Sequence, residues 1–152
     1  MSEPSGPSTP PTEPTRPTPS TATGPGRVLV AVYAIFALAA TARAGVQLVR
    51  DWHEAPLAYG LSALAAVIYV VATVALARGR HRLATVAVST ELIGVLVVGA
   101  FSLADPAAFP RATVWSAFGQ GYGFVPLVLP VLGLLWLRRT APPRAPGPGP
   151  AS

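Results

Sequence analysis

The sequence contains no cysteine and has few charged residues of any kind. Without cysteine the chain cannot form disulfides, thiolate zinc sites or a thiol-disulfide redox centre. Lysine is absent as well, so all 11 basic residues are arginines. Charged residues make up only 11% of the chain, whereas 51% of its 152 residues are hydrophobic. That balance lies outside the usual range of soluble domains and predicts a membrane protein.

The net charge of +5 would also suit a nucleic-acid-binding protein. The arginines, however, stand at the ends of long apolar runs and do not gather on one folded surface. This placement is typical of the positive-inside rule, by which arginines accumulate in short cytoplasmic loops. We therefore expect the lipid bilayer to be the partner of this chain, and we expect no binding of nucleic acid.

Proline-rich segments flank the apolar part of the chain. Residues 1–27 hold eight prolines and no large apolar residue beyond Met1, and residues 138–152 are similarly rich in proline. Such segments cannot bury enough apolar surface to offset the entropy lost on ordering. We predict two disordered cytoplasmic tails around a membrane domain of residues 28–137.

Four apolar runs within residues 28–137 are long enough to cross a bilayer. At a rise of ~1.5 Å per residue, about 20 helical residues match the ~30 Å hydrocarbon core. Short polar or proline-containing segments separate the runs. The sequence therefore predicts an all-α fold, a four-helix transmembrane bundle. Its predicted spans are residues 28–49, 57–77, 83–103 and 118–137.

The distribution of arginines predicts the orientation of these spans. With both termini in the cytoplasm, the inner side carries eight arginines and the outer loops carry two. An even number of spans agrees with termini on one side. We predict a multi-pass protein of the plasma (cell) membrane with cytoplasmic N- and C-termini. The inner arginines are Arg16, Arg27, Arg78, Arg80, Arg82, Arg138, Arg139 and Arg144, and the outer ones are Arg50 and Arg111.

Glu91 lies near the middle of the third predicted span, where a charged side chain costs ~2.5 to 3.5 kcal/mol on insertion scales. Small residues, among them Gly94, share its helical face and predict close packing of another helix there. Glu91 is thus expected to face the bundle interior as the neutral acid, because burial disfavours the charged form. At similar depth, the second span offers Tyr69 and Thr73 as hydrogen-bond partners, on a stripe with Ser62.

Arg43 is the other charged residue inside a predicted span. Depth counting places it near Ser62 and Gln120, and helical side chains lean in the direction that points Arg43 toward Glu91. An axial offset of ~10 Å works against a direct ion pair. Two interpretations stay open. Either Arg43 reaches the outer interface and Glu91 is a structural hydrogen-bonding group, or these residues form a proton or substrate site.

The fourth predicted span opens with GQGYG and continues with two prolines. Gly119 and Gly123 match a GxxxG motif, which predicts close helix packing. Pro126 and Pro130 each remove a helical hydrogen bond, so we expect this helix to be distorted. A broken helix with free carbonyls can bind a cation or substrate, but packing is the commoner use of such glycines.

The sequence offers no centre for metal, cofactor or enzyme chemistry. His53 and His81 are single histidines in loops on opposite predicted sides, so they cannot share a metal ion. The chain also lacks a convincing pairing of nucleophile and base. We expect no enzymatic activity and no cofactor.

Three segments of the chain resemble a known group of proteins. They are RDWHEAPLAYGLSALAAVIYVVATVALA (residues 50–77), TELIGVLVVGA (90–100) and WSAFGQGYGFVPLVLPVLGLLWL (115–137). From about residue 27 to residue 139 the chain is similar to small four-helix integral membrane proteins of actinobacteria, a group of unassigned function. The resemblance implies fold and location but no substrate. Small multidrug exporters also have four helices and one membrane glutamate, but theirs lies in the first helix, where this chain has Arg43.

Two classes of function follow from these patterns. The first is a structural or accessory membrane component, in which buried polar groups specify helix packing or the binding of a partner subunit. The second is a small proton-coupled transporter that uses Glu91 and works as a homo-oligomer, because so small a bundle has thin walls. The first is the main prediction, since no motif defines a substrate.

Overall fold

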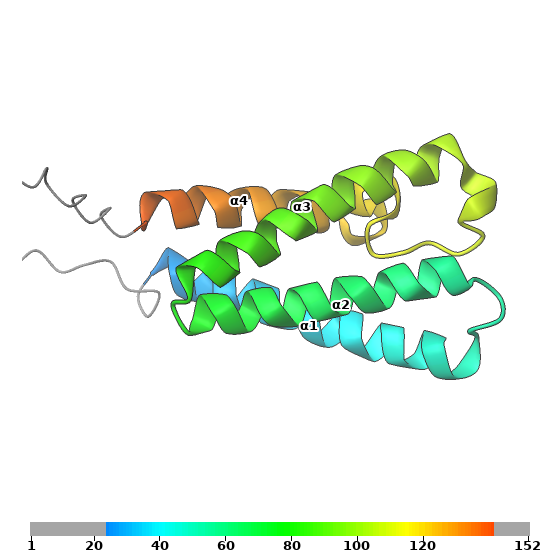
Figure 1. Cartoon of the computed structure of the whole chain (residues 1–152), viewed down its shortest axis with the longest axis horizontal. Coiled ribbons are helices and arrows are strands. Elements are labelled where there is room, and N and C mark those ends of the chain that lie inside the picture. The colour runs from blue at the N-terminus through cyan, green and yellow to red at the C-terminus, as the bar shows by residue number, and fades with distance from the viewer. Residues whose placement is uncertain (1–23, 142–152) are drawn as a thin grey trace, which may run out of the picture.

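The computed structural model of the protein describes residues 24–141, which contain helices and no strand. These described residues form four α-helices, with two short 3-10 helices before the last (Figure 1). The predicted tails lie almost entirely outside the described residues. The elements in order are α1 (Pro25–Arg50), α2 (Pro56–Ala77), α3 (His81–Ala104), η1 (Pro106–Ala108), η2 (Ser116–Tyr122) and α4 (Val125–Arg139).

The first three α-helices agree with the first three predicted spans to within three residues at each end. Each is long and apolar enough to cross a membrane. The first begins earlier than predicted, at Pro25, so residues 25–27 are helical and not part of the tail. Proline suits this position because its fixed φ matches a helix and its missing N–H has no partner in the first turn.

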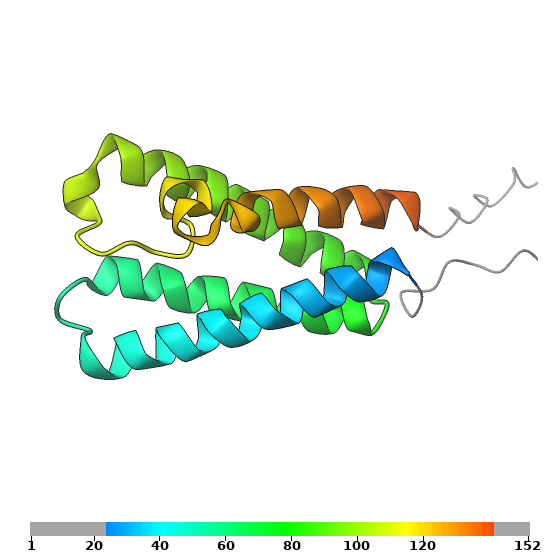
Figure 2. The same ribbon diagram turned by 180° about the vertical axis from the view of Figure 1, so that it is seen from behind.

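Consecutive long helices run antiparallel, and α4 lies along α3 (Figures 1 and 2). The start of α1, the end of α4 and the α2–α3 connection lie at one end of the molecule. The connection at that end contains Gly79, whose φ of 63° lets the chain reverse within a few residues. The start of α1 and the end of α4 thus lie at the same end of the molecule, as an even number of spans predicts.

The fourth predicted span, residues 118–137, is not one helix. The axes of η2 and α4 differ by 100°, and the two elements together are apolar enough to count as one broken span. Ala117, Phe118 and Phe124 have positive φ, a conformation that costs non-glycine residues ~1 to 3 kcal/mol. Pro126 contributes to the break, because a proline inside a continuous helix would collide with the carbonyl four residues earlier. The expected distortion is therefore a sharp corner.

The helices bury many small side chains and expose many large aliphatic ones. Five alanines of α2 are at most 6% exposed, as are further alanines of α1 and α3. Large aliphatic side chains instead point outward along every long helix, as with Leu38 at 74% and Ile93 at 61% exposure. Small interior residues let the helix backbones approach closely. The result is an apolar exterior around an interior that also holds polar groups.

Candidate functional site

Glu91 lies near the middle of α3 and is completely buried. It shares the buried face of α3 with Ala84, Ala87 and Val98, as the spacing of small residues predicted. The hydroxyl of Tyr33 in α1 donates a 2.8 Å hydrogen bond to Glu91 Oε2. Tyr33 is itself fully buried. This bond joins the first and third helices through two polar groups that solvent does not reach.

Three other polar atoms around this bond have no hydrogen-bond partner. They are Glu91 Oε1, the Tyr69 hydroxyl and Trp115 Nε1. Tyr69 is fully buried, with its ring centroid 6.3 Å from that of Tyr33, and lies beside both the Glu91 carboxyl and the Trp115 indole. The predicted hydrogen bond from Tyr69 to Glu91 is not formed, and Tyr33 takes that role. An unpaired buried polar group is costly, so this cluster has capacity for further hydrogen bonds.

The predicted partner Thr73 and its stripe neighbour Ser62 on the second helix bond to their own backbone. Thr73 Oγ1 donates to the carbonyl of Tyr69 at 2.7 Å, and Ser62 Oγ donates to the carbonyl of Ala58 at 2.9 Å. Each bond reaches back four residues along α2, a common way for these residues to satisfy a hydroxyl inside a helix. Ser62 and Thr73 are thus on the polar stripe but do not join the Glu91 cluster.

Gly94 makes room for an indole ring and not for another helix. A Cβ atom on Gly94 would lie 2.8 Å from the ring of Trp115, which is closer than side chains approach each other. Trp115 immediately precedes η2 and is 2% exposed. The ring therefore packs over α3 one turn beyond Glu91, and Gly94 is the residue that permits this packing.

Arg43 does not pair with Glu91. Its guanidinium donates hydrogen bonds to the Tyr122 hydroxyl and, at 3.1 Å, to the carbonyl of Ala112, and it lies 5.8 Å from the centre of the Tyr122 ring. Arg43 is exposed at the level of η2. The geometry favours the interpretation in which Arg43 reaches toward the predicted outer interface over the one in which it forms a site with Glu91.

A polar cavity of about 400 Å³ opens beside Arg43, between the α1–α2 connection and the segment before η2. Gln47 lines it with a buried and unpaired Oε1. Glu54 and Arg111 line it too and form a salt bridge of 3.0 Å, the only one in the part of the chain that the structure describes. Both partners are more than half exposed, so this pair contributes at most ~1 kcal/mol to stability.

The predicted GxxxG contact of the fourth span is wrong. Gly119 and Gly123 have φ of 79° and 62° and form the corner between η2 and α4, so they do not share a helical face. Gly119 packs instead against Pro126, where a Cβ would come within 2.7 Å of the proline ring. Gln120, between them, is exposed and makes no side-chain contact with Arg43 among the described hydrogen bonds.

Two members of the buried cluster were not among the predicted site residues. Tyr33 lies at helical spacing from Ala37, Ala40 and Ala44, which line the same buried face of α1. This spacing of small residues in the sequence indicates the buried face on which Tyr33 lies. Trp115 stands between the third and fourth predicted spans, and nothing in its local sequence indicates that the chain folds back over α3.

The chemistry available to the cluster is hydrogen bonding and proton binding. Within residues 24–141 no group of three or more histidines, aspartates or glutamates is placed to hold a metal ion. Comparison of the chain with protein-family models, with curated proteins and with solved structures gives no match. The resemblance to four-helix membrane proteins of actinobacteria thus stays a prediction.

Proposed function

We propose that this chain is a four-span integral protein of the plasma membrane that acts as a structural or accessory component, with Glu91 as an uncharged hydrogen-bonding group inside the bundle. The broken pair η2 and α4 forms the fourth span. Both termini lie in the cytoplasm. A homo-oligomer or a complex with a membrane partner subunit is the expected working form.

The main support for membrane insertion is the distribution of side chains, which is the opposite of that in a soluble protein. Glu91 and Ser62 are buried, while Leu38, Val67 and Val97 are more than half exposed. A soluble protein rarely exposes contiguous apolar surface on this scale, because water contact with it is unfavourable. Hydrocarbon is the solvent in which such an exterior is stable.

The position of Glu91 supports a structural role. Its carboxyl is enclosed on all sides and hydrogen-bonded to Tyr33, and no salt bridge is present there among the described residues. A buried carboxylate without a cation would be very costly, so the neutral acid is the stable form. A transport site, by contrast, must open to one side of the membrane at a time.

One observation favours proton-coupled transport as a second candidate. Glu91 Oε1, the Tyr69 hydroxyl and Trp115 Nε1 all lack partners at the same place. A transported group with hydrogen-bonding capacity, or a proton relay, would use these atoms. Because η2 meets α4 at a strained corner, a movement of this segment would provide the opening that the enclosed state lacks.

Carbonate extraction and reporter fusions test membrane insertion and orientation together. We expect the full chain to remain with the membrane pellet in alkaline carbonate. Alkaline phosphatase fused after Ser152 should be inactive, and the same enzyme inserted in the α1–α2 connection should be active. A carbonate-soluble protein, or an active C-terminal fusion, would contradict the proposal.

A further inference from the structure

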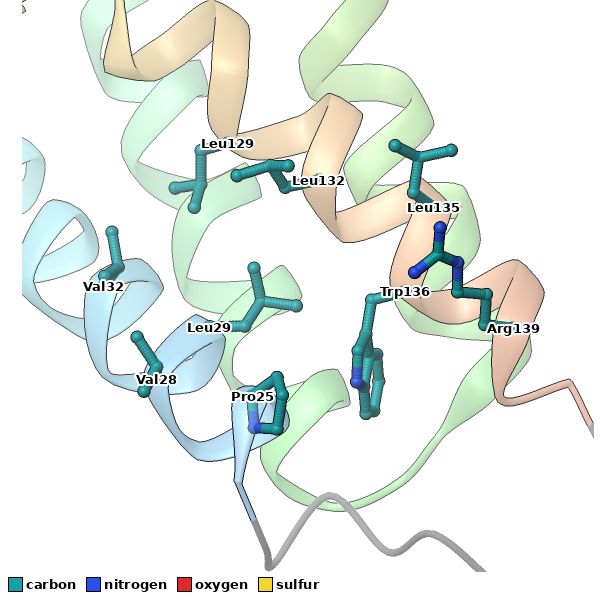
Figure 3. A pocket seen from close by; sticks show the side chains of 9 residues that line it. All are labelled: Pro25, Val28, Leu29, Val32, Leu129, Leu132, Leu135, Trp136 and Arg139. Atoms are coloured by element: carbon teal, nitrogen blue, oxygen red, sulfur yellow. The ribbon is translucent and has the colours of Figure 1, made fainter.

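An apolar groove runs between α1 and α4 at the end of the molecule that carries the start of α1 and the end of α4 (Figure 3). Its volume is about 580 Å³, within the range of sites for small ligands. Leu29 and Leu129 lie buried at its base, whereas Val28 and Leu132 are more than half exposed on its walls. Arg139 adds a guanidinium to this otherwise apolar lining.

The length of the groove matches one leaflet of a bilayer. Along α4 its lining extends from Leu129 to Arg139, and the ten steps between these residues rise by ~15 Å. Half of the ~30 Å hydrocarbon core is the same length. In the proposed orientation, Arg139 and its neighbour Trp136 would stand at the level of the lipid headgroups, where arginine and tryptophan are favoured.

This end of the molecule is strongly basic. Among residues 24–141, it carries six arginines, while the aspartates and glutamates lie in the connections at the opposite end or, for Glu91, in the middle of α3. A ligand with a negative charge is therefore electrostatically complementary to the mouth of the groove. The six are Arg27, Arg78, Arg80, Arg82, Arg138 and Arg139.

We propose that this groove binds one anionic phospholipid, with an acyl chain between α1 and α4 and the phosphate on Arg139. The proposal rests on the proposed membrane insertion. A guanidinium donates to phosphate oxygens through two parallel N–H groups, which makes Arg139 a specific headgroup contact. The apolar walls then take up the chain that the same lipid carries.

The lining of the groove favours an acyl chain as its occupant, because it is apolar except at Arg139. α1 and α4 approach closely at one point, where a Cβ added to Gly133 would lie 3.4 Å from the Tyr33 hydroxyl. A flexible chain fits a space of this kind without displacing the helices.

Native mass spectrometry of the full chain in a mild detergent measures this binding. The probes are phosphatidylglycerol, phosphatidylcholine with the same acyl chains, and glycerophosphoglycerol, which has the headgroup without chains. We expect one molecule of phosphatidylglycerol bound, phosphatidylcholine bound at least ~5-fold more weakly, and no binding of the free headgroup. Equal binding of the two lipids, or binding of the headgroup alone, would overturn the proposal.

Matched variants locate the site. R139Q should weaken phosphatidylglycerol binding by roughly 5-fold, with a smaller loss for R138Q, which removes the same charge outside the groove lining. L132W should fill the groove and abolish binding of both lipids, while V97W, on an exposed part of α3, should not. Equal losses of binding for R139Q and R138Q, or wild-type lipid binding by L132W, would contradict the site. A wild-type dimer that L132W dissociates and V97W does not would also contradict it, because a second copy of the chain would then occupy the groove.

The experiments distinguish a failure of the lipid site from a failure of the proposed membrane insertion. A protein that resists carbonate extraction but shows no preference for phosphatidylglycerol leaves the proposed function intact and overturns the lipid site. Thermal unfolding of each variant in detergent shows that a loss of binding does not come from a loss of fold. Since Arg139 and Leu132 are exposed, both variants should unfold at the wild-type temperature.

Discussion

The Tyr33 hydroxyl and Glu91 Oε2 are joined by a 2.8 Å hydrogen bond between residues 58 positions apart in the sequence. Both side chains are fully buried. The bond connects α1 with α3, which are not consecutive in the chain, and so restricts the rotation of each helix about its axis. Hydrogen bonds between helices in a membrane stabilise by ~0.6 kcal/mol on average and up to ~1.7 kcal/mol. This pair contributes as much by fixing how α1 and α3 are rotated against each other as by the stability that its hydrogen bond adds.

Removing the Tyr33 hydroxyl should destabilise the protein, and removing the Tyr69 hydroxyl should not. Tyr33→Phe leaves Glu91 without its donor, and we expect a loss of ~1 to 2 kcal/mol in the free energy of unfolding. Tyr69→Phe removes a buried hydroxyl that has no partner, so its effect should stay within ~0.5 kcal/mol or be stabilising. Reversible unfolding in mixed micelles measures both. A larger loss for Tyr69→Phe would show that Tyr69, and not Tyr33, is the partner of Glu91.

The packing of the Trp115 ring over α3 can be tested at Gly94. Gly94→Ala places a methyl group 2.8 Å from the ring, and the resulting displacement should cost ~1 to 3 kcal/mol. Gly45→Ala, in α1, meets no atom within 4 Å and should stabilise by up to ~1 kcal/mol through helix propensity. Tryptophan fluorescence should shift to longer wavelength only in the first variant. Equal stability of the two variants would place the indole elsewhere.

Arg43 and Glu91 should behave as independent residues. Arg43 bonds to Tyr122 and to the carbonyl of Ala112, while Glu91 bonds to Tyr33. The effects of Arg43→Gln and Glu91→Gln on unfolding should therefore add to within ~0.5 kcal/mol in the double variant. If the double variant instead recovers stability lost in Glu91→Gln, the two side chains form an ion pair in the folded protein.

The three long helices could be predicted from the sequence because the length of an apolar run and the polar loop that ends it are local signals. The run before Arg50 and the run after Pro56 are separated by a short polar loop, and Gly79 marks the next reversal. The corner before α4 could not be placed in this way. Its glycines fit a helical GxxxG motif equally well, and only the contacts of Gly119 with Pro126 and of Gly99 with Phe118 show the fold that is adopted.

The buried site could be predicted in part, because the periodicity of a single helix is also a local signal. The burial of Glu91 follows from the periodicity of α3 alone, and the burial of Tyr69 and Ser62 from that of α2. The choice between Tyr33 and Tyr69 as donor depends on how α1 and α2 are rotated about their axes. That rotation is set by packing across several helices, which spacing within a single helix does not specify.

The paired variants Glu91→Gln and Glu91→Ala test the structural role of Glu91 most directly, through thermal unfolding in detergent and pH-dependent exchange in proteoliposomes. Glutamine keeps the shape and an oxygen that accepts from Tyr33, so we expect stability within ~0.5 kcal/mol of wild type and no change in any proton-dependent flux. Alanine leaves a cavity and an unpaired Tyr33 hydroxyl and should cost about 2 kcal/mol or more. Wild-type stability of Glu91→Gln combined with loss of a proton-dependent flux would contradict the structural role and make Glu91 a transport residue.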